Sequence, residues 1–142
     1  MGYVDLRVFA HATEDPERVL TAVRNVLPSE LVDSVVFNRF SLTGHHGNPI
    51  VLFEARVKDR KVVQAVFARF CSGLGLMDKE VLADSIAGHL ERGNLYVRLD
   101  KQSAFLGEFK LGSFDSVHVR VHFKRHGTDE VVGVCRDFGL LP

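Results

Sequence analysis

The sequence has no tryptophan, only two cysteines and four prolines, and no net charge over its 142 residues. No uncharged apolar run approaches the ~20 residues of a membrane span, so we expect no membrane segment. The cysteines, Cys71 and Cys135, lie far apart and form no CxxC pair. Asp5 and Arg7 stand where a secretory signal would have apolar residues. Together these absences predict a cytoplasmic protein with reduced thiols.

The motifs of common enzyme classes are also missing. The chain contains no GxSxG, no phosphate-binding P-loop, no GxGxxG and no HExxH. We therefore predict a protein without catalytic activity, cofactor or metal. The histidines near the last predicted strand are not expected to share an ion, because residues four apart on a strand lie ~13 Å apart. A metal or phosphate-dependent enzyme that uses His11, His45 and His46 stays a minor alternative.

Hydrophobic patterning predicts the fold class. Period-two alternation and turn residues predict strands over residues 4–10, 34–43, 50–57, 95–100, 103–109 and 116–124. Apolar residues at helical spacing predict helices after Asp15, Asp59 and Asp78, and from Thr128. No repeat or linker divides the chain. We predict one α+β domain over residues 1–142, a two-layer sandwich with an antiparallel or mixed sheet and helices packed on one face.

The strand predicted over residues 116–124 carries the sharpest functional signal. Its valines and Phe123 alternate with His118, Arg120, His122 and Lys124, which therefore share the opposite face, roughly 6.6–7 Å apart. Arg125 extends this row. A two-layer fold leaves that face open, and cations at this spacing suit the phosphates of a nucleic-acid strand. An ordinary polar solvent face is the alternative, and it stays open.

Three further groups are candidate contact sites. They are His45, His46 and Asn48 in the loop Gly44–Pro49, Arg56, Lys58 and Lys61 where a strand passes into a helix, and Arg98 and Lys101 beside a predicted turn. The loop could hold a phosphate or a base edge through its imidazoles and backbone N–H groups. Each group also suits an ordinary turn or a solvated surface.

Three blocks of the sequence resemble one family. They are His11-Ala12-Thr13-Glu14-Asp15-Pro16-Glu17, Leu42-Thr43-Gly44-His45-His46-Gly47-Asn48-Pro49-Ile50 and Leu95-Tyr96-Val97-Arg98-Leu99-Asp100-Lys101-Gln102. These blocks resemble archaeal predicted RNA-binding proteins that are described as exosome-subunit-like. The resemblance implies a ribosomal protein L5-like α+β fold, compared by some with double-stranded-RNA-binding domains. It also implies a cytoplasmic protein linked to RNA processing or degradation.

We therefore predict a non-catalytic RNA-binding protein, accessory to RNA processing or degradation and associated with the exosome. Its basic sheet face and loops would contact phosphates, with weak sequence preference and strong salt dependence. Tyr96 is the one aromatic residue predicted near that face, so base stacking should be minor. The alternative is a protein-interaction or homodimeric subunit without RNA affinity of its own.

Overall fold

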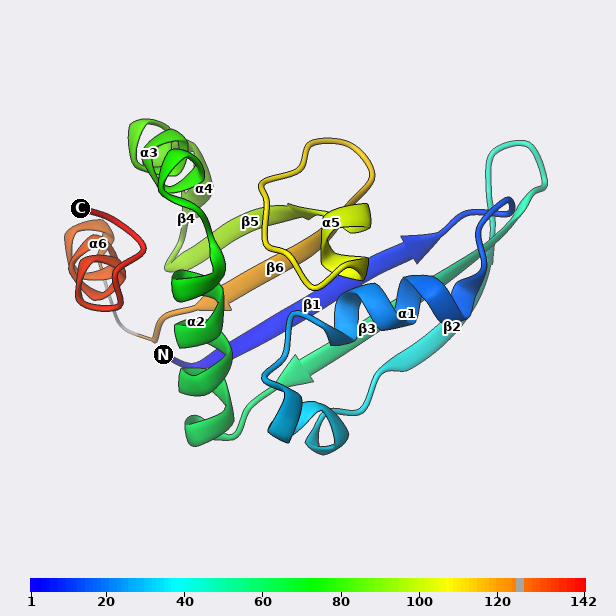
Figure 1. The fold of residues 1–142 in the computed structure, drawn as a ribbon, viewed down its shortest axis with the longest axis horizontal. Helices are drawn as coiled ribbons and strands as arrows, with labels where there is room; N and C mark the ends of the chain where they lie inside the picture. The colour runs from blue at the N-terminus through cyan, green and yellow to red at the C-terminus, as the bar shows by residue number, and fades with distance from the viewer. Residues whose placement is uncertain (125–126) are drawn as a thin grey trace.

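A computed structural model describes residues 1–124 and 127–142. Its centre is a six-stranded sheet with the strand order β2-β3-β1-β6-β5-β4 (Figure 1). The strands are β1 (Tyr3–Ala10), β2 (Asn38–Thr43), β3 (Pro49–Val57), β4 (Leu90–Glu91), β5 (Asn94–Asp100) and β6 (Ser116–His122). Every neighbouring pair is antiparallel. Of the predicted antiparallel or mixed sheet, the antiparallel form is therefore confirmed.

The helices that cover the sheet lie on one side of it. They are α1 (Pro16–Arg24), the 3-10 helix η1 (Ser29–Ser34), α2 (Arg60–Gly73), α3 (Leu76–Asp84), α4 (Ile86–His89), α5 (Lys101–Phe105) and α6 (Thr128–Asp137). Figure 1 shows α1, α2 and α5 over one face of the sheet, with α3 and α6 beyond the end where the chain begins. Among the described residues, the other face has no helical layer, which confirms the predicted two-layer α+β sandwich. No helix of the described residues is long and apolar enough to cross a membrane.

Local capping fixes where the helices begin. Asp15 precedes Pro16 and accepts a hydrogen bond from the Glu17 N–H at 3.0 Å, which satisfies an otherwise unpaired donor of the first turn. Asp59 accepts from the N–H groups of Lys61 and Val62 in the same way. Both starts agree with the sequence prediction.

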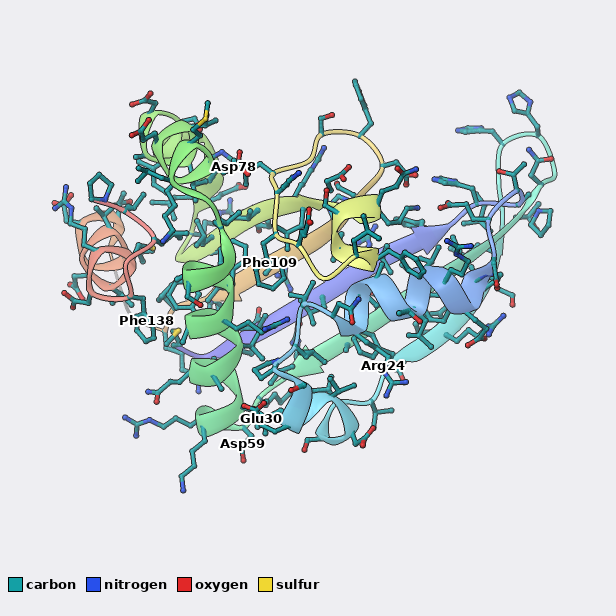
Figure 2. The ribbon with its side chains drawn as sticks, viewed as in Figure 1. Arg24, Glu30, Asp59, Asp78, Phe109 and Phe138 are labelled. Carbon is teal, nitrogen blue, oxygen red and sulfur yellow. The ribbon has the colours of Figure 1, made fainter. Side chains whose placement is uncertain are left out.

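The core forms between the inner face of the sheet and the helices. The alternate β1 residues Val4, Leu6, Val8 and Ala10 are all buried, and α2 adds Phe67. The Phe67 ring lies 5.0 Å from that of Phe138, just after α6 (Figure 2), and 5.9 Å from that of Phe123. Each fully buried side chain of this size contributes about 1.5–3 kcal/mol through removal from water.

Both cysteines belong to this core, and neither forms a disulfide. Cys71 on α2 and Cys135 on α6 are buried and unbonded. Burial raises the pKa of the Cys71 thiol to about 12 and that of Cys135 to about 11, so both stay protonated at neutral pH.

Several predicted elements differ in the structure. The strand predicted over residues 103–109 is wrong, because Asp100 accepts from the Ser103 N–H at 3.0 Å and starts the short helix α5. The third helix begins at Leu76, and Asp78 accepts instead from the Leu111 N–H. The strand predicted over residues 34–43 covers only Asn38–Thr43. In the first two cases a capping or tertiary contact outweighed the local pattern.

Candidate functional site

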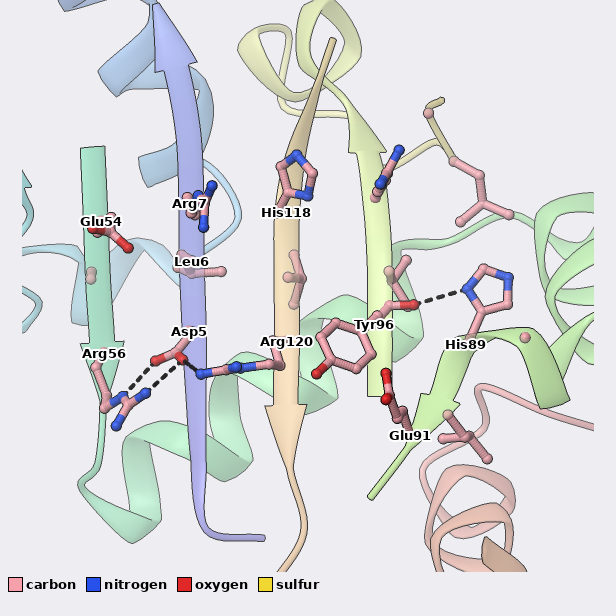
Figure 3. Close-up of a pocket in the computed structure, with 18 of the residues that line it drawn as sticks. Asp5, Leu6, Arg7, Glu54, Arg56, His89, Glu91, Tyr96, His118 and Arg120 are labelled. Atoms are coloured by element: carbon pink, nitrogen blue, oxygen red, sulfur yellow. Dashed lines mark hydrogen bonds and ion pairs between the residues drawn. The ribbon is translucent and has the colours of Figure 1, made fainter. Parts of the chain in front are cut away.

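The sheet face without helices is built by the residues that alternate with the core positions. It presents Tyr3, Asp5, Arg7 and Phe9 from β1, Glu54 and Arg56 from β3, Tyr96 and Arg98 from β5, and His118, Arg120 and His122 from β6. We call this surface the open face. A hollow of about 1170 Å³ lies over it (Figure 3). Its lining includes Phe40 of β2 and His89 at the end of α4. Strands far apart in sequence therefore line one site.

The centre of the open face is a carboxylate between two guanidinium groups. Arg56 donates from Nε and Nη2 to the two oxygens of Asp5, at 2.7 and 2.9 Å. Arg120 donates to the same carboxylate from the other side (Figure 3). Burial alone would raise the pKa of Asp5, but these hydrogen bonds hold it below its ordinary value. The group carries a net positive charge, although much of the charge of Arg56 and Arg120 is engaged within the protein.

A second row of the open face is more available to a ligand. Arg7 opposes His118 across the strands, and His118 opposes Arg98. Both arginines are exposed, and among the described residues neither has an ion pair with a carboxylate. Burial, followed by the nearby charges of Arg98 and Arg7, lowers the pKa of His118. The row therefore places a cation on each side of His118, and Glu54 of β3 lies opposite Arg7.

The C-terminal part of the row predicted on β6 partly contacts other residues of the protein. His122 contacts Asn94 Oδ1 through Nδ1 at 2.8 Å and stacks on the Tyr3 ring at 4.7 Å. Lys124 is exposed but lies beyond the end of β6. Arg125 lies outside the described residues. The predicted shared face is therefore confirmed for His118, Arg120 and His122.

The predicted loop site lies elsewhere. His45, His46 and Asn48 are exposed at the tip of the hairpin between β2 and β3, which extends past the end of the other strands (Figure 1). The Gly44 N–H donates to the Asn48 carbonyl at 2.8 Å, and Gly47 takes a φ of 76° that favours glycine. The loop is thus an ordered turn, separate from the centre of the open face.

The basic residues predicted where a strand passes into a helix lie in two different environments. Arg56 is bound to Asp5, as described above. Lys58 follows the last residue of β3, Lys61 lies in the first turn of α2, and both side chains are exposed. These two lysines extend positive charge from the open face to one end of the sheet.

Lys101 is not available as a surface contact, which corrects its prediction as an RNA-binding residue. It is 5% exposed, and its ammonium donates to the Phe9 carbonyl at 2.9 Å, to Glu14 at 2.9 Å and to Asp115 at 2.7 Å. The sequence could not show this, because only the tertiary structure brings Phe9, Glu14 and Asp115 to the Lys101 side chain.

The residues around Lys101 resemble a metal-ligand set. Oxygen and nitrogen atoms of His11, Glu14 and Asp115 lie within 4.8 Å of one another. The Lys101 ammonium binds both carboxylates, so it already supplies the positive charge that a metal would bring. Burial would raise the pKa of Asp115, but Lys101, then His11, hold it below its usual value. We therefore interpret this cluster as an internal ion-pair network.

The sequence reasoning missed several residues of the site. Arg7 and Phe9 were visible as the outward positions of an alternating strand, but only the central place of β1 in the sheet shows that they matter. Phe40 lines the main hollow, and Phe114 lines a smaller adjoining one with Phe9 and His118. No sequence signal pointed to Phe114, because its setting depends on the folded loop.

Comparisons with known proteins show the family of this chain. The model of a family described as RNA binding matches residues 3–123. The RNA-binding protein PAB1135 of Pyrococcus abyssi is 35% identical over 124 residues, which cover 85% of this chain and 80% of that protein. The uncharacterized protein MJ0213 of Methanocaldococcus jannaschii is 27% identical over 120 residues, with 82% and 80% covered.

Solved structures of archaeal proteins share the fold. Mth689, a DUF54 protein from Methanothermobacter thermautotrophicus, matches with a TM-score of 0.75 and 27% identity over 99% of this chain and 98% of that one. SSO0741 from Sulfolobus solfataricus matches with a TM-score of 0.80 and 22% identity, covering 96% of each chain. Since the family model matches most of its length, the chain belongs to this RNA-binding family.

Proposed function

We propose that the protein binds RNA without catalysis and that the open face is its main contact surface. The observation that carries this proposal is the row Arg7–His118–Arg98, in which two exposed arginines line a broad hollow. Guanidinium groups bind phosphate oxygens with charge-assisted, often paired hydrogen bonds. The name of the relative PAB1135 as an RNA-binding protein supports the proposal.

The other candidate residues take graded roles in this proposal. Arg56 and Arg120 keep the centre of the face positive while Asp5 fixes their positions. Lys58, Lys61 and Lys124 are exposed and extend the phosphate path toward one end of the sheet. His122 borders this path. The hairpin residues His45, His46 and Asn48 would form a second, separate contact with a longer RNA.

A salt titration with matched variants tests the proposal. The probe is a fluorescein-labelled single-stranded RNA, and anisotropy gives its affinity from low to moderate salt. We expect the double variant Arg7→Ala/Arg98→Ala to bind at least tenfold more weakly. The slope of log affinity against log salt should become shallower by about 0.7 for each phosphate that the variant no longer neutralises.

The matched control removes the same charge from the helical side. Arg18 and Arg24 lie on α1, away from the open face, so Arg18→Ala/Arg24→Ala should retain the wild-type affinity and slope. An equal loss in this control would show that only net charge matters and would overturn the assignment to the open face. No binding of wild-type protein at low salt would overturn RNA binding itself.

Association with RNA processing and the exosome is the finer part of the proposal. It is supported only by the family resemblance, as are the cytoplasmic location and the ribosomal protein L5-like fold. Purification of the tagged protein from its native cells, with and without ribonuclease, tests it. Recovery of exosome subunits after ribonuclease treatment would support a direct partnership, and their absence would contradict it.

Self-association is the second candidate, favoured by β2. This strand lies at the edge of the sheet, all six of its residues are exposed, and Phe40 and Leu42 are among them. An unpaired strand edge can add a strand from another chain. Sedimentation at several concentrations, with Leu42→Lys as the variant, would show a dimer that the substitution weakens. A monomer at all concentrations would contradict this candidate.

A further inference from the structure

We infer that the open face takes single-stranded RNA and stacks unpaired bases on exposed aromatic rings beside its arginines, with Phe114 as the leading ring. This inference rests on the proposed function and specifies its substrate class. It reverses the prediction that stacking is minor, because the structure brings more aromatic residues to this face than Tyr96 alone.

The first observation is the exposure of aromatic rings in and beside the hollow. Tyr96 is 40% exposed, Phe40 is 44% exposed and Phe114 is 94% exposed. Figure 3 shows the Tyr96 ring over the sheet next to Arg120. The Phe114 ring is exposed to water, so its burial does not stabilise the fold. A ligand that covers this ring would gain the free energy of removing it from water.

The second observation is that Phe114 is presented by an anchored loop. On one side of it, the Ser113 carbonyl accepts from Arg98 Nη1 at 3.0 Å. On the other side, Asp115 accepts from Lys101 at 2.7 Å and contacts His11 at 3.1 Å. The loop is thus anchored through the Ser113 carbonyl before Phe114 and through the Asp115 carboxylate after it, while the Phe114 ring is exposed. Such pre-organisation lowers the entropy that a bound ligand must offset.

The third observation places this ring next to the cations. His118 lines both the main hollow and the smaller one of about 230 Å³ that Phe114 and Phe9 share. Arg98 contacts the Phe114 loop directly, and Arg7 lies 5.1 Å above the Phe9 ring. If these arginines bind the phosphate of a nucleotide, its base would lie near the rings of Phe9 and Phe114 on the same surface.

This combination favours unpaired RNA over a duplex. Bases in a duplex are already stacked on one another, so a protein ring has no base face to contact. In a single strand each base has an accessible π-face, and stacking on an aromatic side chain is tolerant of sequence. The ring beside guanidinium groups also distinguishes this surface from a purely apolar protein-docking patch.

Substitutions of the rings, which remove no charge, test the inference. The probe is a single-stranded RNA that contains 2-aminopurine, whose fluorescence falls when the base stacks. We expect Phe114→Ala to bind at least fivefold more weakly, with reduced quenching and an unchanged salt slope. Tyr96→Ala should weaken binding as well, whereas Tyr96→Phe, which keeps the ring, should retain quenching.

The control is Leu106→Ala. Leu106 is another exposed apolar residue between α5 and β6, but it lines neither hollow. This variant should bind as wild type, and thermal melting should confirm that every variant is folded. A duplex of the same length should bind wild-type protein at least fivefold more weakly than the single strand.

The outcomes separate this inference from the proposed function. Wild-type affinity and quenching in Phe114→Ala and Tyr96→Ala would overturn the inference, as would equal affinity for the duplex. Weaker binding by Arg7→Ala/Arg98→Ala would then still support RNA binding by the open face. If Phe114 instead serves only a protein partner, RNA affinity will be unchanged and the inference again fails.

Discussion

Arg56 and Arg120 donate to the same Asp5 carboxylate from opposite sides, although they lie on strands separated by β1. The three residues occupy one cross-strand row of the sheet, with Asp5 in the middle. One carboxylate thus orders two guanidinium groups at the centre of a face that we propose to bind phosphates.

Replacing Asp5 should have opposite effects on stability and on RNA binding. Asp5→Asn removes the charge that pairs Arg56 and Arg120, so we expect a decrease of about 1–3 kcal/mol in the free energy of unfolding. The two arginines would then be available to phosphates, so affinity should rise and the salt slope should steepen. Urea unfolding and anisotropy measure the two effects. Weaker RNA binding in the folded variant would contradict this view of the cluster.

The same cluster predicts how stability changes in acid. The pKa of Asp5 is lower in the folded protein than its ordinary value of about 4. Its stabilising contribution is therefore complete above that pH and is lost as the pH falls through the folded-state pKa. Unfolding free energies between pH 6 and pH 2 should fall less steeply in Asp5→Asn than in wild type. Parallel curves would show that Asp5 is not the linked group.

His118 should couple RNA binding to proton uptake. Its pKa is lowered in the RNA-free protein by burial and by Arg98 and Arg7, and a phosphate at this row would raise it again. Affinity should therefore increase as the pH falls through the bound-state pKa and level off below the RNA-free value. Anisotropy from pH 8 to pH 5.5 should show this gain in wild type. An undiminished gain in His118→Gln would contradict the assignment.

Lys101 should support the fold rather than the contact with RNA. Lys101→Met leaves the Phe9 carbonyl, Glu14 and Asp115 without their shared donor, and should lower the free energy of unfolding by about 1–3 kcal/mol. Affinity per folded molecule should be unchanged. The matched variant Lys58→Met, at an exposed lysine, should show the reverse pattern. Equal stability of Lys101→Met and wild type would contradict the structural role.

Gly112 lies too close to β5 for any side chain. A Cβ there would come within 2.8 Å of the Asp100 backbone nitrogen and 3.0 Å of the Leu99 carbonyl carbon. Gly112→Ala should therefore destabilise the protein by about 1–3 kcal/mol. Gly133 within α6 has open space, so Gly133→Ala should stabilise it by about 0.5–1 kcal/mol. Urea unfolding of both variants tests this contrast, which similar effects would contradict.

Some of the site was predictable because its signals are local. Alternation along residues 116–124 placed His118, Arg120 and His122 on one face, and the strand geometry confirms this. The prediction for Lys101 was wrong because a lysine beside a turn looks exposed until the fold brings the Phe9 carbonyl, Glu14 and Asp115 around its ammonium. Lys101 shows that residue type alone does not distinguish a surface cation from a buried one.

Local sequence was enough to specify the elements with strong signals, such as the helices that begin after Asp15 and Asp59, because capping and periodicity act within a few residues. It also specified which residues of β1 and β6 share a face. The position of β1 between β3 and β6, which brings Arg56, Asp5 and Arg120 into one row, emerged only from the folded chain. Strand pairing and loop anchoring depend on contacts between residues far apart in the sequence, and local sequence patterns do not predict such contacts.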